Sequence, residues 1–133
     1  MTLVLDASVT LAWCYTDEQS EWALRILRKT SRDGAVVPRI WQFEIVNGLT
    51  VGERRRRLER SDAENFLDFL DTLPIEHDPM APSPLRLLHL TRDTSLSAYD
   101  SLYLEVSLRR GLPLATQDRV LKKAASQVGV NVI

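Results

Sequence analysis

A short apolar run that stops at an aspartate constrains this chain more than any other feature of its sequence. The run is Leu-Val-Leu at residues 3–5, which is too short for a helix, and helical spacing of apolar residues begins after Asp6. This pattern predicts a buried strand, an acid at its carboxyl end and the start of a helix. Parallel α/β proteins bind ligands at the carboxyl ends of their strands, so Asp6 lies where a functional site is expected.

Short apolar runs and helical patterns alternate along the rest of the chain. The sequence predicts further strands at residues 35–37, 74–77, 112–116 and 130–133, and helices at residues 9–15, 19–31, 40–49, from 61 onward, 85–94, 97–110 and 119–127. Such alternation implies a mostly parallel sheet with helices on both faces. We therefore predict a single α/β domain over residues 1–133, with a central sheet of four or five strands.

Two local patterns in the middle of the chain predict specific features. Residues 40–49 are apolar on nearly every side, so we expect a helix that is packed deep in the protein. Pro38 stands at a favoured first helical position for that helix. The segment Ser61-Asp62-Ala63-Glu64 matches a capping box and predicts the start of the next helix.

The charge and cysteine content exclude several classes of protein. Seventeen Lys and Arg against eighteen Asp and Glu give a net charge of -1, so any contact with nucleic acid requires a local basic patch. The single Cys14 cannot form an internal disulfide, and one cysteine with two histidines argues against a zinc site. The sequence shows no leader and no membrane-spanning run, so we expect a cytoplasmic protein without membrane contact.

The only run of charges in the chain contains the four consecutive arginines Arg54, Arg55, Arg56 and Arg57. One interpretation is a solvated helix end, because cations interact favourably with the negative pole of the helix dipole. The other is a surface that contacts RNA phosphates or an acidic partner. The sequence leaves both interpretations open.

Four acids fall at positions that a parallel sheet brings to one edge. Asp6 and Asp118 follow strands and Asp100 begins a helix, although Asp100 and Asp118 are also suited to helix capping. Glu44 lies among apolar neighbours, where a carboxylate is unfavourable unless it is paired or holds a cation. Asn47 lies one turn beyond Glu44 on the same helix face. We predict that the four acids form one site.

Four ionised acids in one site require a counter-charge. At about 6 Å and an effective dielectric constant near 20, each pair of carboxylates repels by roughly 3 kcal/mol. A divalent cation relieves this repulsion, and Mg²⁺ or Mn²⁺ fits best because hard cations prefer oxygen ligands and share their sites with phosphate oxygens. Such an ion activates a water molecule and neutralises charge on a phosphodiester under attack. Hydrolysis of a nucleic-acid backbone is the reaction class that follows.

The segments 3–8, 97–100 and 116–118, together with Glu44 and Asn47, resemble the four motifs of PIN-domain ribonucleases, in particular the VapC-type toxins of bacterial toxin–antitoxin systems. The resemblance covers essentially the whole chain. It implies a PIN fold and an acidic pocket for Mg²⁺ or Mn²⁺ made of four acids: Asp6, Glu44, Asp100 and Asp118. It also implies supporting residues around that pocket, namely Ser8, Asn47 and Thr116. A protein of this kind is an endoribonuclease toxin that is inhibited by a small cognate antitoxin and commonly forms a homodimer.

Two other functions are compatible with parts of the pattern. A phospho-receiver domain is also a small parallel α/β fold with acids around magnesium, but it needs a pair of adjacent acids after the first strand, whereas Asp6 stands alone. It also needs a lysine at the end of a late strand, and Lys122 and Lys123 fall within a predicted helix. The other alternative is a PIN fold that binds RNA or protein without catalysis. The four intact acids argue against this alternative.

Overall fold

Four short parallel strands form the central sheet of the computed structural model, which describes residues 1–133. The strands are β1 (Leu3–Leu5), β2 (Ala35–Val37), β3 (Ile75–His77) and β4 (Leu114–Ala115), in the spatial order β3-β2-β1-β4. Val4 pairs with Val36 on one side and with Leu114 on the other, so β1 lies inside the sheet. This arrangement confirms the predicted α/β class and the mostly parallel sheet.

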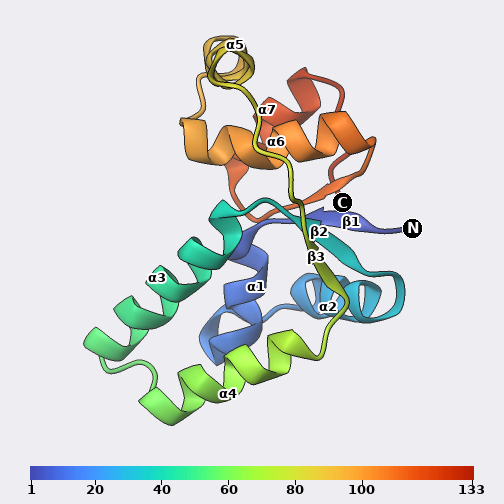
Figure 1. The fold of residues 1–133 in the computed structure, drawn as a ribbon. Coiled ribbons are helices and arrows are strands. Elements are labelled where there is room, and N and C mark those ends of the chain that lie inside the picture. Colours follow the sequence, from blue (N-terminus) through green and yellow to red (C-terminus); the bar gives the residue numbers. More distant parts are fainter.

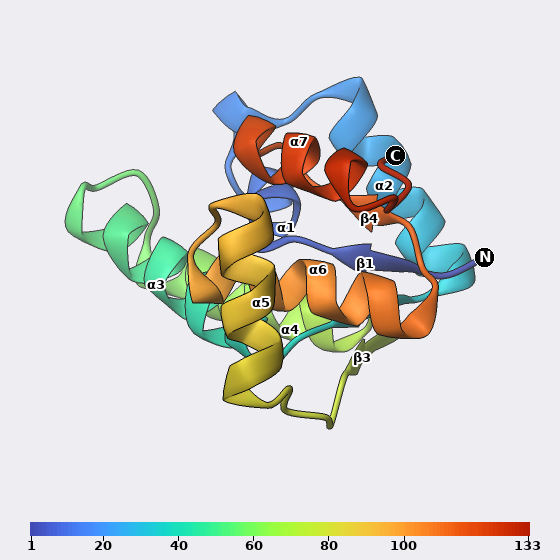
Figure 2. The same ribbon diagram turned by 90° about the horizontal axis from the view of Figure 1, so that it is seen from above.

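Seven helices cover the two faces of this sheet. They are α1 (Ala7–Cys14), α2 (Glu21–Asp33), α3 (Ile40–Arg54), α4 (Arg60–Asp71), α5 (Pro84–Thr94), α6 (Ala98–Arg110) and α7 (Arg119–Gln127). Figure 1 shows α1 to α4 on one side of the sheet and α5 to α7 on the other, and Figure 2 shows α5 crossing over α6. The change of side occurs after β3, where the chain returns across the sheet to β4 beside β1. Right-handed crossovers in opposite directions place their helices on opposite faces.

The core lies on both faces of β1 and β2, whose residues are all buried. Strands covered on both faces are continuously apolar, which is why Leu-Val-Leu and Ala-Val-Val were recognisable in the sequence. Helix α6 is also buried over much of its surface, and Tyr103 and Leu104 are fully inaccessible. No helix is both long and apolar enough to cross a membrane.

The predicted burial of the helix after Pro38 is wrong on one face. Helix α3 buries a stripe of Trp41, Ile45 and Leu49, but Phe43 is 58% exposed and Val46 is 51% exposed. The helix begins at Ile40, two residues later than a Pro38 start requires, and continues to Arg54. Helical residues four apart share a face, so one stripe reaches the core and the apolar residues between its members face outward.

Two glycines allow α3 to lie close against α1 and the turn that follows it. A Cβ atom at Gly48 would come within 2.5 Å of Leu11 Cδ1, and one at Gly52 would overlap the Tyr15 hydroxyl oxygen. The Tyr15 hydroxyl donates a hydrogen bond of 2.8 Å to the Gly48 carbonyl. Close approach of the backbone is therefore the reason that α3 tolerates glycine at these two positions.

The predicted start of α4 and the predicted last strand also differ from the structure. Helix α4 begins at Arg60, and the Glu59 N–H donates to Asp62 Oδ2 at 3.4 Å, so the capping pattern starts two residues before Ser61. In the last segment only Val132 bridges to Leu114. The Val130 N–H is directed to the carbonyl of Ala125 in α7, which leaves too few residues for a strand.

Candidate functional site

Asp6 follows β1 and is held by two hydroxyl groups. Ser8 Oγ donates a hydrogen bond of 2.7 Å to Asp6 Oδ2, and Thr116 Oγ1 donates one of 2.6 Å to the same oxygen. Thr116 reaches Asp6 because Leu5 and Ala115 are register partners in the neighbouring strands β1 and β4. Asp6 is 7% exposed, and its Oδ1 atom has no side-chain donor. The fold thus fixes this carboxylate while leaving one oxygen available.

Asp118 is tied to the same strand ends through the backbone of residues 116–118. Its N–H donates to Thr116 Oγ1 at 3.0 Å, and the Gln117 N–H donates to Ser8 Oγ at 3.3 Å. Asp118 Oδ1 accepts hydrogen bonds from the Val120 and Leu121 N–H groups and caps α7. Asp118 is exposed. It therefore acts as a helix cap and also presents a carboxylate beside Asp6.

Glu44 lies half-buried in α3 and accepts a hydrogen bond from α6. The donor is the Tyr103 hydroxyl, 2.5 Å from Glu44 Oε1, and Tyr103 itself is completely buried. In the sequence, Tyr103 stands out only as an apolar member of the helix predicted at residues 97–110. One feature of the sequence indicates a role near the acids. A buried tyrosine hydroxyl needs a hydrogen-bond partner, and Asp100 lies one turn before Tyr103 on the same helix face.

Asp100 occupies the first turn of α6 without using its carboxylate in the cap. The N-cap is Ser97, whose Oγ accepts a hydrogen bond of 3.1 Å from the Asp100 N–H. The Asp100 side chain is half-buried and forms no hydrogen bond or ion pair of its own. The capping pattern therefore explains the position of Ser97, and the carboxylate of Asp100 is free for another role.

The four acids carry negative charge that no cation of the chain balances. None of them forms an ion pair with Lys or Arg. Burial raises the pKa of Asp6, and the charge of Asp118 raises it further, against the opposing effect of its two hydroxyl partners. Burial also raises the pKa of Asp100, with added repulsion from Asp118 and Asp6. The pKa of Glu44 is raised by burial and by repulsion from Asp6 and Asp100, although the Tyr103 hydroxyl lowers it.

The donor set at this edge fits a hard divalent cation in its chemistry. Every available group is a carboxylate or hydroxyl oxygen, which Mg²⁺ and Mn²⁺ prefer. No group of three or more acidic, histidine or cysteine side chains is close enough to hold a metal ion directly. Magnesium commonly binds through one or two carboxylates and keeps several waters, so a site of this type does not require three direct protein ligands.

Two other predicted groups form no hydrogen bond or ion pair with the acids. Asn47 is exposed and forms no hydrogen bond to a carboxylate. The arginines lie at the far end of α3, and Arg54 is ten residues from Glu44, or about 15 Å along the helix axis. Arg57 is engaged there, since it bonds Asp17 at 3.0 Å and lies over the Tyr15 ring at 4.3 Å. The remaining three arginines of this run are exposed and form no ion pair: Arg54, Arg55 and Arg56.

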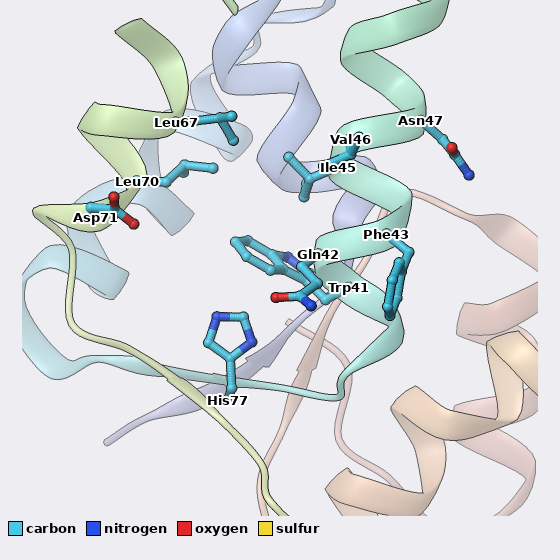
Figure 3. Close-up of a pocket in the computed structure, with 10 residues that line it drawn as sticks. All are labelled: Trp41, Gln42, Phe43, Ile45, Val46, Asn47, Leu67, Leu70, Asp71 and His77. Carbon is cyan, nitrogen blue, oxygen red and sulfur yellow. The ribbon is translucent and has the colours of Figure 1, made fainter. Parts of the chain in front are cut away.

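An apolar hollow of the molecule is separate from the acids. It is a groove of about 550 Å³ between α3 and α4, lined mainly by apolar residues, including Trp41, Ile45 and Leu70. His77 stands beside Trp41 with the two rings 5.6 Å apart in an edge-to-face arrangement, as Figure 3 shows. None of the four acids lines the groove. Its apolar surface is suited to a macromolecular contact rather than to hydrolysis.

Comparisons with known proteins agree with this architecture. The family model described as PIN domain matches residues 3–127. The crystal structure of PAE2754 from Pyrobaculum aerophilum aligns with 99% of this chain and 91% of that chain, with a TM-score of 0.67 and 23% sequence identity. At this identity the likeness concerns the fold. No curated protein matches the chain significantly.

Proposed function

The chain belongs to the PIN domain family, and from this premise we propose that it is a metal-dependent endoribonuclease that acts as a VapC-type toxin. The observation that carries the proposal is the edge of the sheet where Asp6, Glu44, Asp100 and Asp118 influence one another's charge without any cationic partner. Carboxylates without a cationic partner repel one another, which is unfavourable. Metal-dependent hydrolases use such carboxylates to bind the metal ion.

The protein's own residues divide the work as follows. Asp6 supplies a fixed carboxylate whose orientation is set by Ser8 and Thr116. Glu44, Asp100 and Asp118 complete the oxygen donors that would hold Mg²⁺ or Mn²⁺, and Asn47 is available to support Glu44 from the next turn. When bound, the ion supplies Lewis acidity toward a phosphodiester and lowers the pKa of water.

The proposed partners follow from the same assignment. RNA is the substrate, and Arg54, Arg55 and Arg56 offer unpaired cations to its phosphates or to an acidic segment of a partner. A small cognate antitoxin is the proposed inhibitor, the active form is a homodimer, and the groove between α3 and α4 is an apolar surface available for such contacts. We place the activity in the cytoplasm, where its RNA substrates are.

The first test is cleavage of a mixed RNA panel by the purified chain with Mg²⁺ or Mn²⁺. The controls are EDTA and Asp6→Asn, which removes one negative charge with almost no change in side-chain volume. Cleavage by the wild-type chain that disappears in both controls supports the proposal. A folded protein that binds RNA with equal affinity in all samples but cleaves none of it would point to the non-catalytic binding module instead.

The toxin role requires a separate measurement in cells. Expression of the chain without an antitoxin is expected to slow growth, and Asp100→Asn is expected to relieve the effect at equal protein level. The comparison with Asp100→Asn separates loss of catalysis from loss of protein. Growth inhibition that persists in both Asp6→Asn and Asp100→Asn would contradict an RNA-cleaving toxin.

A further inference from the structure

Four cationic side chains share one face of α2. Because they are spaced by three, four and seven residues, they lie side by side on the helix, and they are Arg25, Arg28, Lys29 and Arg32. All four line a hollow of about 540 Å³ between α2 and residue 133, which we call the α2 hollow. No acidic side chain lines it.

The positive charge around the α2 hollow is only partly balanced. Asp33 pairs with Lys29 at 3.5 Å and with Arg32 at 3.0 Å. Arg25 and Arg28 are exposed and form no ion pair, even with the other acid of the helix. Unpaired surface cations attract anionic groups, so the local charge predicts an anionic ligand.

Apolar side chains line the same hollow beside the cations. They are Trp22, Ile26 and Ile133, of which Trp22 is half-buried and Ile133 is 38% exposed. Lys122 of α7 lies over the Trp22 ring, with its Nζ atom 5.5 Å from the ring centroid, and adds a further cation. A ligand that fits the whole hollow therefore needs apolar groups as well as negative charge.

The α2 hollow is distinct from the site of the four acids, none of which lines it. Helix α2 ends at Asp33, and β2 starts two residues later at Ala35, which is the register partner of Leu3 at the start of β1. Asp6 follows the other end of β1. Figure 2 shows both ends of the chain beside α2. The end of α2 that carries Arg32 therefore lies at the opposite edge of the sheet from Asp6.

We propose that the α2 hollow binds an acidic amphipathic helix of a partner protein. Carboxylates of this helix pair with Arg25, Arg28 and Arg32, and its apolar side chains cover Trp22 and Ile133. Arg25 and Arg32 are seven residues apart, or about 10.5 Å along the axis, which is also the separation of acids seven residues apart on a second helix. Charged side chains that flank an apolar contact between two helices determine partner choice. The inference does not depend on the proposed ribonuclease function.

A nucleic-acid backbone would match only the cationic part of this surface. Its phosphates could bind the arginines, but interfaces with nucleic acid are more polar than those between proteins. Phosphate and sugar groups offer nothing apolar to Ile133, and Lys122 already lies over the Trp22 ring. The apolar lining therefore favours a peptide with acidic and apolar side chains.

The test is binding of a fluorescein-labelled peptide of about 18 residues, or five helical turns, by the full chain. The peptide has glutamates on one helix face and leucines on the adjacent face, and a scrambled peptide of the same composition is the reference. Fluorescence anisotropy should show tighter binding of the patterned peptide, with an affinity that falls as salt is added. The double variant Arg25→Glu, Arg28→Glu is expected to weaken this binding about ten-fold.

A matched control reverses two charges on another helix. Arg86 and Arg92 of α5 are exposed and form no ion pair, so Arg86→Glu with Arg92→Glu changes the net charge by the same amount. This variant should keep the affinity of the wild type for the patterned peptide. Equal losses in the two double variants would mean that net charge alone attracts the peptide, and the inference would be wrong.

Nuclear magnetic resonance locates the bound peptide. The indole N–H signal of Trp22 should shift when the patterned peptide binds, because Trp22 lines the α2 hollow. Trp41 lines the groove between α3 and α4, and its signal should stay in place. A shift of the Trp41 signal alone would place the peptide in that groove and contradict the inference.

Two further results would overturn the inference. Equal affinity for the patterned and scrambled peptides, or binding of neither, excludes an amphipathic helix as the occupant. Tighter binding of a labelled RNA or DNA duplex than of the patterned peptide, lost in Arg25→Glu, Arg28→Glu, assigns the α2 hollow to a nucleic-acid backbone. None of these measurements involves RNA cleavage, so their failure leaves the proposed ribonuclease function unaffected.

Discussion

Asp6 is 7% exposed and has no cationic partner, so its ionised form is unfavourable in the metal-free fold. Burial raises the pKa of Asp6, Glu44 and Asp100 above the values of about 4 that these groups have in an unfolded chain. The folded state therefore binds more protons at these sites than the unfolded state. The three acids therefore add their full contribution to the free energy of unfolding at a pH below their pKa values in the unfolded chain. This contribution is lost as the pH rises through their pKa values in the folded protein.

Asp6→Asn is expected to abolish cleavage and to raise the melting temperature of the metal-free protein by a few degrees near neutral pH. The amide oxygen still accepts the hydrogen bonds of Ser8 and Thr116, and the buried charge is gone. Urea unfolding in EDTA at several pH values measures the effect, and the variant should lose part of the decline in stability between about pH 4 and neutrality.

Asp33 provides the control for this pH dependence. Its hydrogen bonds with Arg32 and the amino terminus lower its pKa, so its contribution is present above the unfolded pKa and is lost as the pH falls. Asp33→Asn is therefore expected to lower the stability at neutral pH and to leave it unchanged at low pH, so that the slope of the profile changes only on its acidic side. If Asp6→Asn were no more stable than the wild type at neutral pH, the ionised carboxylate of Asp6 would not be destabilised by burial.

Tyr103→Phe tests the residue that orients Glu44. The change removes the only hydrogen-bond donor to Glu44 and leaves the ring in place. We expect a loss of about 1–3 kcal/mol in the free energy of unfolding and weaker binding of Mn²⁺. Titration calorimetry with Mn²⁺ measures the metal affinity separately from the free energy of unfolding.

The matched control for Tyr103→Phe lies in the same helix. Ser107 has a buried hydroxyl that forms no hydrogen bond, so Ser107→Ala should change neither stability nor metal affinity appreciably. Equal Mn²⁺ affinity of Tyr103→Phe and the wild type would mean that Tyr103 contributes to packing alone.

At the scale of the elements, α6 is fastened to the segment after β3 by a buried group of charges. Arg109 bonds Asp78 at 2.8 Å and Glu105 at 2.8 Å, and both acids are almost inaccessible. Arg110 also reaches Asp78, at 3.2 Å. These contacts hold α6, and with it Asp100 and Tyr103, against the sheet.

Arg109→Ala is expected to destabilise the protein by about 3–5 kcal/mol, because it leaves the buried carboxylate of Glu105 without its partner and Asp78 with Arg110 alone. Urea unfolding measures the loss. Arg32→Ala is the control, since Arg32 bonds Asp33 on the surface and such exposed pairs contribute little to stability. Similar losses in the two variants would show that burial of the Arg109 group is unimportant.

The end of α3 gives a prediction about RNA affinity. Replacing Arg54, Arg55 and Arg56 together by alanine should weaken RNA binding and reduce the dependence of affinity on salt, because fewer phosphate counterions are released. Anisotropy titrations at several salt concentrations provide the slope. Arg57→Ala removes one cation that is already bonded to Asp17, so its salt slope should stay near that of the wild type. Identical slopes in all variants would assign the arginines to a solvated helix end.

At the scale of the whole molecule, the net charge is -1, but the charges are unevenly distributed. Many arginines are neutralised by nearby acids, as Arg32, Arg57, Arg109 and Arg110 are. The four acids at the sheet edge are not neutralised. Folding therefore gathers negative charge at this edge that the unfolded chain spreads out, and a cation that binds only the folded state would stabilise it.

Mn²⁺ is accordingly expected to raise the melting temperature of the wild-type protein. An ion present at 100 times its dissociation constant adds about 2.7 kcal/mol to the free energy of unfolding, or several degrees for a domain of this size. Thermal unfolding with increasing Mn²⁺ measures the effect. Asp100→Asn should reduce the shift strongly, and an undiminished shift in that variant would show that the ion binds elsewhere.

The sequence by itself determined the features that depend on local chemistry. The strands β1 and β2 are buried on both faces and are therefore apolar without interruption. Ser97 caps the start of α6, and Gly111 ends the helix with a φ of 63°. The positions of Asp6 and Asp118 after strands predicted a common edge, because parallel strands end on the same side of a sheet. These inferences need only neighbouring residues and one rule of topology.

Only the tertiary structure decided which side chains meet. The hydrogen bond from Thr116 to Asp6 joins residues 110 positions apart, and the one from Tyr103 to Glu44 joins residues 59 positions apart. The exposure of Phe43 was missed for the same reason, since an apolar helix does not reveal which of its faces finds a partner. Such contacts depend on the relative placement of packed elements, and short-range patterns in the sequence carry little information about that placement.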